Sequence, residues 1–541
     1  MNKKILSLII AAIPATMPAQ TAIDAYQLSR SDLRGTARFM SMGGAFGALG
    51  GDLSTLTQNP GGIGVYRKSE IGFTLDIDMQ ASKSSTPLYT GKSDQTRAYV
   101  NNIGYIGSMN TGSELMPVFN WGFSYGRAAS FDRRYHGRAD MNGSLSDYIA
   151  GYTTAEGWRS EDLAGDPDGT NYFANGGAPW LSILAYNSYA INNIPGFDDR
   201  YAGLWGNGTY GESGFDVEEK GYIDEYAINF GGYFSNTVYW GIGFGITDID
   251  YKQYTYYTED MQNAQIPVED ADGNVVASTP AGHAGGFGLD SRKHISGTGF
   301  NFKAGLIVRP INELRLGFAV HTPTYYNLQE NSDGIIDYGY GYTDGKLKPG
   351  YSGTPVDYRE WKLRTPWRLM ASAAVVLGTQ GLISMDYEYR PYQNMSMRYD
   401  NGDEYTDGNN DIKNYYQSSN IIRLGGEWRV TNNLSLRAGY AYETSPTRSE
   451  LTRPDTDVMI YTSNPYDTGT TPSYTLDNTT QYITCGIGYR YKSFYADAAY
   501  VHKARKSQYS AFTPYNGYAE PYTADIKENN NNIVLSVGFK F

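Results

Sequence analysis

Glycine is concentrated in one short stretch, Ser41–Gly62, which reads SMGGAFGALGGDLSTLTQNPGG and ends in an Asn-Pro turn. Glycine-rich segments cradle phosphate groups, pack membrane helices together, or let backbone pass through a crowded space. A phosphate loop needs Lys-Ser or Lys-Thr after its glycines, and neither follows here. Gly47 and Gly51 have the spacing of a helix-pairing motif, but Asp52 interrupts the apolar stretch that this motif requires. The run is therefore predicted to fill a confined space.

The histidine, serine and acidic residues show no pattern typical of a catalytic or metal site. None of the five histidines has the spacing of an H-E-x-x-H zinc motif. Gly350–Gly353 comes close to the G-x-S-x-G nucleophile elbow but lacks its spacing. The stretch Asp407–Asn414 has some calcium ligands but lacks the rest of a known loop, so a solvated turn is predicted. We expect no enzyme activity, no metal and no cofactor.

A set of charged residues in the C-terminal half has the most regular spacing. These residues alternate with apolar ones, so they are predicted to share the inner face of a sheet: Asp386, Glu388, Arg390, Arg423, Glu427, Arg429, Arg437, Glu443, Arg490 and Asp497. Charges removed from water must be paired, so one interpretation is a network that anchors a segment inside the protein. The other is that Arg423 or Arg437 binds an anionic head group, because guanidinium groups bind carboxylates in a bidentate manner.

The elements that position these residues are predicted to be strands of a membrane barrel. In the C-terminal NIVLSVGFKF, the residues at 533, 535, 537, 539 and 541 are apolar, and those between them are mostly small or polar. The same alternation recurs upstream. The second face carries glycine and charge, which suits the interior of a large barrel better than a packed soluble core.

Reading backward from Phe541 gives about fourteen strands, an even number as in single-chain bacterial barrels. They are predicted near 69–80, 101–109, 117–127, 222–234, 237–252, 295–309, 313–325, 366–379, 381–395, 417–430, 433–446, 479–491, 493–505 and 531–541. Short links such as Ser235–Asn236 alternate with long polar loops, which are typical of the periplasmic and external ends of such barrels. We therefore expect both chain termini to lie on the periplasmic side.

The beginning of the chain reads as a secretory signal peptide, residues 1–19. Lys3 and Lys4 precede the apolar run Ile5–Ile13, and small residues follow as far as Ala19. No later apolar run approaches the ~18 residues that a membrane helix needs. Cys485 is the only cysteine, so no intrachain disulfide can form. The net charge of -13 argues against nucleic acid as a partner.

One long loop, residues 128–221, carries helical patterns. The clearer one, Pro179–Ile194, begins with proline at a helix start and has an apolar stripe. This helix is predicted either to cap the barrel mouth or to form a hydrophobic groove where a ligand first binds. The candidate groove residues are Trp180, Leu181, Leu184 and Tyr189.

The residues before the first strand resemble the N-terminal hatch of the FadL-type outer-membrane transporters of hydrophobic compounds, most closely the Bacteroidetes branch. The matching positions are Gly35, Arg38, Ser41, Gly43, Gly44, Gly47, Gly50, Gly51, Asp52, Asn59 and Pro60. Similar segments continue downstream at Leu314–Tyr326, Arg364–Gly378 and Ala178–Ile191, and Phe541 matches the terminal assembly signal of outer-membrane barrels. The family usually has alanine at the position of Gly61.

The resemblance implies an all-β fold: a 14-stranded antiparallel transmembrane β-barrel, residues 69–541, with residues 20–68 as a hatch, or plug, inside the lumen. It also implies passive uptake of hydrophobic compounds such as long-chain fatty acids across a Gram-negative outer membrane. The hatch would move when ligand binds, and the cargo would leave through a gap in the third strand, near Pro117–Arg127. Arg423, Arg437 and Glu427 are the candidate lumen contacts to the anion or the hatch.

The expected partners are hydrophobic cargo, outer-membrane lipid and the barrel-assembly machinery, and the protein is expected to be a monomer. The alternative function is a surface-binding barrel, such as a haem receptor or an adhesin, whose hatch stays closed. A water-filled porin is disfavoured because about fifty residues would have to be placed elsewhere.

Overall fold

The computed structural model describes residues 21–164, 173, 177–269, 272–278, 284–341, 347–452, 469–513 and 521–541. The predicted signal peptide, residues 1–19, lies outside them. Within the described ranges, no helix has the length and apolar character that a membrane-crossing helix requires.

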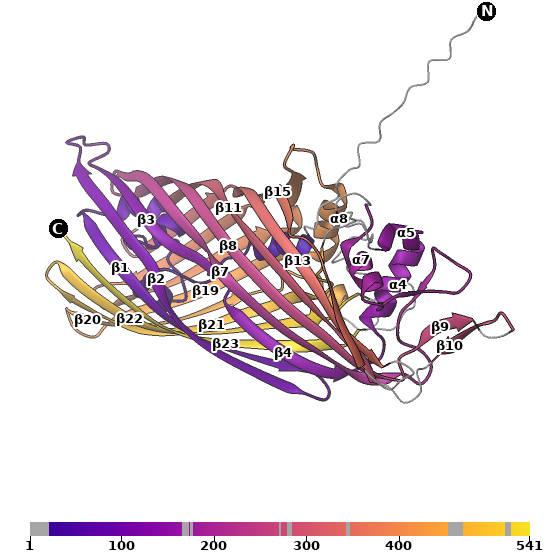
Figure 1. Ribbon diagram of the computed structural model, residues 1–541. Helices are drawn as coiled ribbons and strands as arrows, with labels where there is room; N and C mark the ends of the chain where they lie inside the picture. The colour runs from indigo at the N-terminus through magenta and orange to yellow at the C-terminus, as the bar shows by residue number, and fades with distance from the viewer. Residues whose placement is uncertain are drawn as a thin grey trace, which may run out of the picture.

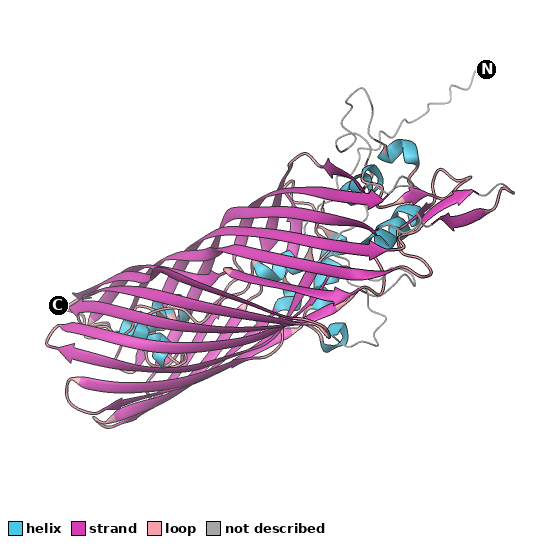
Figure 2. Ribbon diagram, turned by 60° about the horizontal axis from the view of Figure 1, so that its bottom comes forward, coloured by secondary structure: helices cyan, strands magenta, loops and turns pink. Residues whose placement is uncertain are grey.

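The strands form a closed antiparallel barrel (Figure 1, Figure 2). The barrel segments are β1 (Glu70–Ser85), β2 (Thr90–Asn110), β3 (Val118–Ser130), β4 (Arg133–Asp140), β7 (Tyr210–Phe234), β8 (Val238–Gln262), β11 (Ala284–Val308), β12 (Leu314–His321), β13 (Tyr325–Gly341), β14 (Leu347–Gly353), β15 (Asp357–Arg364), β16 (Arg368–Leu377), β17 (Gly381–Pro391), β18 (Ser396–Tyr399), β19 (Ser418–Arg429), β20 (Leu434–Glu443), β21 (Tyr474–Tyr491), β22 (Phe494–Ser510) and β23 (Thr523–Lys540). β23 pairs with β1 and closes the barrel.

Four of the barrel's paths consist of more than one segment. β3 continues into β4, β12 into β13, β14 through β15 into β16, and β17 into β18, because each group pairs with the same neighbouring strands. Counted as continuous paths, the barrel has fourteen strands. The predicted fold class is confirmed.

The outer face of the barrel is apolar, as the period-two pattern predicts. On β23, Ile533, Leu535 and Val537 are between 41% and 46% exposed, while Val534 and Ser536, which alternate with them, are buried. The prediction that Arg429 and Arg490 point into the lumen is wrong. Both are exposed, because they lie at the periplasmic ends of β19 and β21, beyond the enclosed lumen.

Several strands are longer than predicted. β7, β8 and β11 each have 25 residues and continue past the apolar belt at the loop end of the barrel. In their outer halves the outward-facing positions are mostly polar or glycine, whereas inward-facing residues such as Phe215, Tyr257 and Leu289 are buried in the core of the loop end. The lipid-facing pattern therefore ends earlier than the strands do.

The loop end of the barrel carries the remaining elements, at the opposite end from the C-terminus (Figure 1). They are α4 (Leu145–Ala155), α5 (Ser160–Leu163), α7 (Trp180–Asn187), β5 (Asn192–Asn193), β6 (Tyr201–Ala202), β9 (Ile266–Glu269), β10 (Val275–Ser278), η2 (Tyr392–Asn394), α8 (Thr406–Tyr415) and η3 (Ser449–Thr452). The turn predicted at Asp407–Asn414 is wrong. This stretch forms α8 because Ile412 and Tyr415 are buried against neighbouring loops.

The N-terminal segment, residues 21–68, runs through the barrel from the loop end to the periplasmic end. It contains α1 (Ala22–Gln27), α2 (Ala37–Ser41), α3 (Thr55–Gln58) and η1 (Pro60–Val65). α1 contacts α8 at the loop end, whereas η1 contacts β8 and β7 near their periplasmic turn. The expectation that both ends are periplasmic is therefore wrong for the start of the described chain, which reaches the periplasmic end only after crossing the lumen.

Candidate functional site

The glycines of the N-terminal segment allow its backbone to lie directly against the barrel wall. Gly43 has φ of +62°, and a Cβ atom there would meet the backbone nitrogen of Tyr440 at 2.9 Å. Gly61 packs on Gly305 of β11, where a Cβ atom on Gly61 would lie 2.9 Å from the carbonyl carbon. Side chains at these positions would push the segment away from the wall.

The other residues predicted for the hatch also lie in this segment. Gly35, Ser41, Gly44, Gly47, Gly50, Asp52, Asn59 and Pro60 are buried, and Arg38 and Gly51 are partly buried. Asp52 accepts a 2.8 Å hydrogen bond from the hydroxyl of Thr36 and a 2.9 Å bond from the amide of Ser54. Its contacts thus hold the segment's own fold together.

Buried carboxylates of the wall hold the segment from the β16–β20 side. Asp386 accepts hydrogen bonds from the amides of Phe46 (3.0 Å) and Gly47 (2.9 Å) and from the side chain of Gln58 (3.1 Å). Glu427 pairs with Arg38 of the segment at 3.0 Å and with Arg437 of the wall at 2.7 Å. Of the predicted lumen residues, Glu427 and Arg437 therefore lie together.

Arg423 belongs to a different cluster. Its guanidinium is 2.7 Å from Glu388, which also pairs with Arg368 at 2.7 Å and Arg390 at 2.6 Å. Glu388 is fully buried and forms ion pairs with all three arginines. The side chain of Arg437 has a second partner in Asp497, at 2.5 Å.

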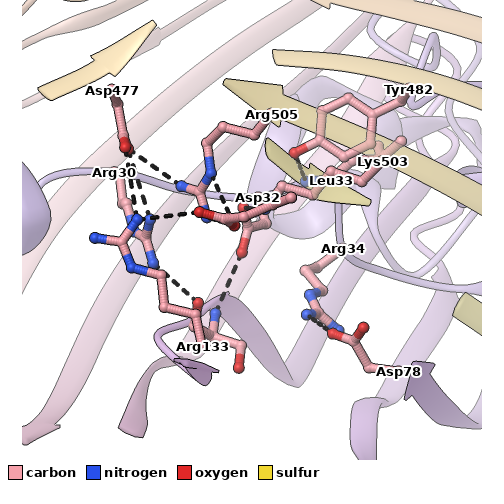
Figure 3. Close-up of polar contacts among 12 residues, drawn as sticks. Arg30, Asp32, Leu33, Arg34, Asp78, Arg133, Asp477, Tyr482, Lys503 and Arg505 are labelled. Carbon is pink, nitrogen blue, oxygen red and sulfur yellow. Dashed lines mark hydrogen bonds and ion pairs between the residues drawn. The ribbon is translucent and has the colours of Figure 1, made fainter. Parts of the chain in front are cut away.

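Three further residues of the segment, which no sequence pattern singled out, are paired with the barrel wall (Figure 3). Arg34 contacts two carboxylates of β1, Asp76 at 2.5 Å and Asp78 at 2.9 Å. Asp32 pairs with Lys503 at 2.5 Å, and Arg30 donates to the carbonyl of Ser130 at 3.1 Å. The signal that could have found them is charge itself, since a charged residue in a segment predicted to fill a lumen needs a partner there.

The outermost part of the segment is held by loop aromatics. Tyr26 of α1 stacks on Tyr416, with ring centroids 5.0 Å apart, and meets Tyr392 edge-on at 5.1 Å. Asp24 forms an ion pair with Lys293 of β11. The segment is thus fixed at its outer end, in its middle and near the periplasm.

The spaces between the segment and the wall are small. One cavity of ≈ 70 Å³ lies between residues 31–35 and the wall, and another of ≈ 60 Å³ lies beside residues 28–31. Sites for small molecules usually enclose about 300–1,000 Å³. In this arrangement, the described lumen cavities admit water but no chain-like hydrophobic molecule.

The ladder between β2 and β3 ends part-way along the wall. Its last pair is Asn102↔Gly126, although β2 continues outward to Thr90. Beyond this point β3 has a register shift between Arg127 and Ala129 in its pairing with β7. The ≈ 70 Å³ cavity is lined on this side by residues 101–102 and 126–128.

The residues predicted for a ligand groove are mostly enclosed. Trp180, Leu181 and Leu184 of α7 are at most 6% exposed and pack with α4 and the outer ends of the strands. Tyr189 is 51% exposed. In this conformation the helix contributes to a closed cap over that part of the barrel end.

The buried carboxyl group of Glu259 joins this cap to the barrel outside the membrane-spanning part, and the partly buried Asp147 of α4 lies near it. Glu259 of β8 accepts a 2.7 Å hydrogen bond from the amide of Leu145, at the start of α4, and bonds to Ser144. Burial raises the pKa of Glu259 to about 7. Burial and the nearby Glu259 raise the pKa of Asp147 to about 8.

We therefore expect the cap to loosen as pH rises. Because the folded cap binds these protons more tightly than the unfolded loop does, its free energy of unfolding falls between the ordinary carboxyl pKa values and about pH 8. Limited proteolysis within residues 141–209 should be slower at acidic than at alkaline pH. In the Glu259→Gln variant, the rate of proteolysis should depend less on pH. An identical pH dependence in both proteins would contradict this expectation.

Comparison with known proteins gives the class of the molecule. A family model described as "Outer membrane protein transport protein (OMPP1/FadL/TodX)" matches residues 233–529, more than half of the chain. No match is found among curated proteins. A solved FadL homologue of Pseudomonas aeruginosa has 14% identity and a TM-score of 0.52, and the match covers 95% of this chain and all of that one.

Two toluene transporters are also similar. For TodX of P. putida the identity is 12% and the TM-score 0.45, with 94% of this chain and 99% of that chain covered. For TbuX of Ralstonia pickettii the identity is 11% and the TM-score 0.44, again with 94% of this chain and 99% of that chain covered.

The chain belongs to the OMPP1/FadL/TodX family of outer membrane transport proteins. It is an outer membrane transport protein of a Gram-negative bacterium, and it is a channel rather than an enzyme.

Proposed function

We propose that the protein takes up single-chain hydrophobic molecules, with long-chain fatty acids as the leading candidates, by diffusion through the barrel. The N-terminal segment acts as a hatch that moves to admit the cargo, and the cargo leaves sideways where β2 and β3 separate. The observation that carries this proposal is the ≈ 70 Å³ cavity, which touches both the segment and the end of the β2–β3 ladder.

The need for movement follows from size. A fatty acid cannot occupy spaces of ≈ 60 and ≈ 70 Å³, so transport requires residues 28–35 to shift. The glycine run would be the body of the hatch, and the ion pairs of Arg30, Arg34 and Arg38 would hold it closed between transport events.

The charge of the cavity supports an anionic head group. Arg368, Arg390 and Arg423 all line it, and they share Glu388. A bound carboxylate would give these arginines a second acceptor. Arg437 is less suited to this role, since it pairs with both Glu427 and Asp497.

A closed surface receptor is the second candidate. The observation that favours it is the number of buried ion pairs that fix the segment at separate levels of the lumen. In that case the hatch would never move, and binding would take place on the loops alone.

Uptake of labelled fatty acid by cells should separate the two functions. Cells with the full chain should accumulate label faster than cells without it, and deletion of residues 20–62 should change the rate and admit polar solutes. The Arg134→Gln variant, which breaks an exposed ion pair with Asp216, should behave like the unaltered protein. If the full chain gives no uptake above the background of empty cells, the closed receptor is the better description.

A further inference from the structure

Three neighbouring strand paths are interrupted at the same level of the barrel wall. β12 and β13 are separated by Thr322–Thr324, β15 and β16 by Thr365–Trp367, and β17 and β18 by residues 392–395. The levels coincide because His321↔Arg368 and Tyr325↔Arg364 are register partners on either side of the first two gaps. We call residues 322–324, 365–367 and 391–395 the proline break.

Each of the three interruptions contains or follows a proline: Pro323, Pro366 and Pro391. Proline has no backbone N–H to give to a ladder, and it is rare inside sheets for this reason. One such position would be an isolated irregularity. Three on adjacent strands interrupt the ladder over a continuous piece of the wall, where isolated backbone bonds remain, from Thr322 to Phe302 at 2.9 Å and from Thr365 to Thr324 at 3.1 Å.

Threonine side chains take the place of the missing ladder bonds. The amide of Phe302 donates to the hydroxyl of Thr322 at 3.0 Å, and the amide of Thr324 donates to the hydroxyl of Thr365 at 2.8 Å. A hydroxyl can rotate to another partner, whereas a ladder bond is lost only when the strands separate. The wall therefore opens at a lower cost here than along its regular ladders.

An apolar hollow of ≈ 670 Å³ lies on the lipid-facing side, next to the break. Its lining includes Trp240, Leu306 and Phe318. Leu369 and Tyr389, at its outer end, lie close to the break along β16 and β17. The hollow is shallow and open toward the membrane, so a chain lying in it stays in contact with lipid.

On the lumen side of the break lies the ≈ 60 Å³ cavity, whose lining includes Thr322, Thr324, Thr365 and Pro366. This lining contains more cations than carboxylates. Its cations are Arg30, Lys303, Arg368 and Arg390, and its carboxylate is Glu225. Lys303 pairs with Glu225, and the side chain of Arg368 keeps 27% of its surface exposed. The inner side of the break is therefore suited to a carboxylate, and the outer side to a hydrocarbon chain.

We propose that the proline break is a second lateral passage between the lumen and the membrane, in addition to the gap between β2 and β3. Its occupant is a fatty acid, whose chain lies in the outer hollow while its carboxylate meets Arg368. A carboxylate would give the partly exposed Arg368 a second acceptor beside Glu388, which a neutral hydrocarbon cannot do. A gap of three or four residues per strand suits one chain better than two. The inference rests on the proposed function, because it supplies that transport with another route.

A disulfide across the break tests the passage. The variant carries Thr324→Cys and Thr365→Cys, at positions whose backbones are joined by a 3.1 Å hydrogen bond, with Cys485→Ser to remove the native thiol. Two matched variants carry the bridge at Asn102 and Gly126, beside the other gap, or at Tyr500 and Ile533, within the regular β22–β23 ladder and away from the hollow. Fatty-acid uptake is measured before and after reduction.

The oxidised Thr324/Thr365 bridge should cause a partial loss of uptake that reduction restores, and the Tyr500/Ile533 bridge should cause none. Bridging both gaps together should abolish uptake. The second passage is overturned if the Thr324/Thr365 bridge leaves uptake unchanged, or if the Asn102/Gly126 bridge alone abolishes it. If the protein takes up no fatty acid even when its disulfides are reduced, the proposed function itself is contradicted.

The hollow has a readout that does not depend on transport. A photoreactive amino acid replaces Phe318, which is 54% exposed, or Leu535, which is 46% exposed on the opposite run of strands. In detergent-solubilised protein, labelled fatty acid should cross-link at position 318 and not at 535, and Arg368→Gln should weaken the capture. Equal labelling at both positions would overturn the assignment of the hollow to cargo. So would a second result, in which phospholipid of reconstituted vesicles labels position 318 as strongly as fatty acid does.

Discussion

Replacement of Glu388 by glutamine should destabilise the barrel more than any exposed substitution. Glu388 is fully buried and is the carboxylate partner of Arg368, Arg390 and Arg423. Glutamine keeps the size of the side chain but removes the charge, so three neighbouring cations repel one another. Removal of one partner from a buried ion pair typically costs about 3–5 kcal/mol.

Thermal unfolding of the solubilised barrel, followed by circular dichroism, measures this effect. The midpoint should fall clearly for Glu388→Gln. Glu212→Gln is the matched control, because Glu212 pairs with Arg138 at 3.3 Å but both side chains are at least 50% exposed. Such pairs contribute about 0–1 kcal/mol. Equal midpoints for the two variants would show that Glu388 does not hold its three arginines together.

The barrel was predictable because its physical cause is local. A strand places alternate residues on opposite faces, so the lipid-facing row at 533, 535 and 537 is visible in the sequence itself. The ends of β7 and β8 were less visible. Above the membrane an extended strand needs no apolar outward face, so the lipid-facing signal stops before the hydrogen bonding does.

The partners of the N-terminal segment depend on contacts between residues far apart in the chain. Arg38 and Glu427 are separated by 389 positions, and nothing in either neighbourhood specifies the other. The inward direction of Arg423 and Arg437 followed from the strand phase, but their partners did not. The same holds for α8, whose Asp- and Asn-rich sequence favours a turn and becomes helical where Tyr415 packs with the loop aromatics.

The second large effect concerns movement of the N-terminal segment. Its contacts are dense, yet the described cavities beside it are too small for a hydrocarbon chain. If the protein transports such molecules through its lumen, the segment must leave part of the wall during each event. A covalent bond between the segment and the wall should then stop uptake without altering the closed structure.

Ala37 and Ser536 offer a position for this bond. The amide of Ala37, at the start of α2, donates a 2.7 Å hydrogen bond to the hydroxyl of Ser536 on β23. Two residues this close lie within reach of a disulfide, which needs Cα atoms about 4.4–6.8 Å apart. The background again carries Cys485→Ser, and the two single-cysteine variants serve as controls.

The decisive measurement is the initial rate of fatty-acid uptake by cells carrying Ala37→Cys and Ser536→Cys, before and after reduction. If the hatch must move, cells with the oxidised protein take up no more label than cells without the barrel, reduction restores uptake, and the single-cysteine variants transport throughout. Full uptake through the oxidised, cross-linked barrel would contradict hatch movement, because cargo would then cross the membrane while this part of the segment stays on the wall.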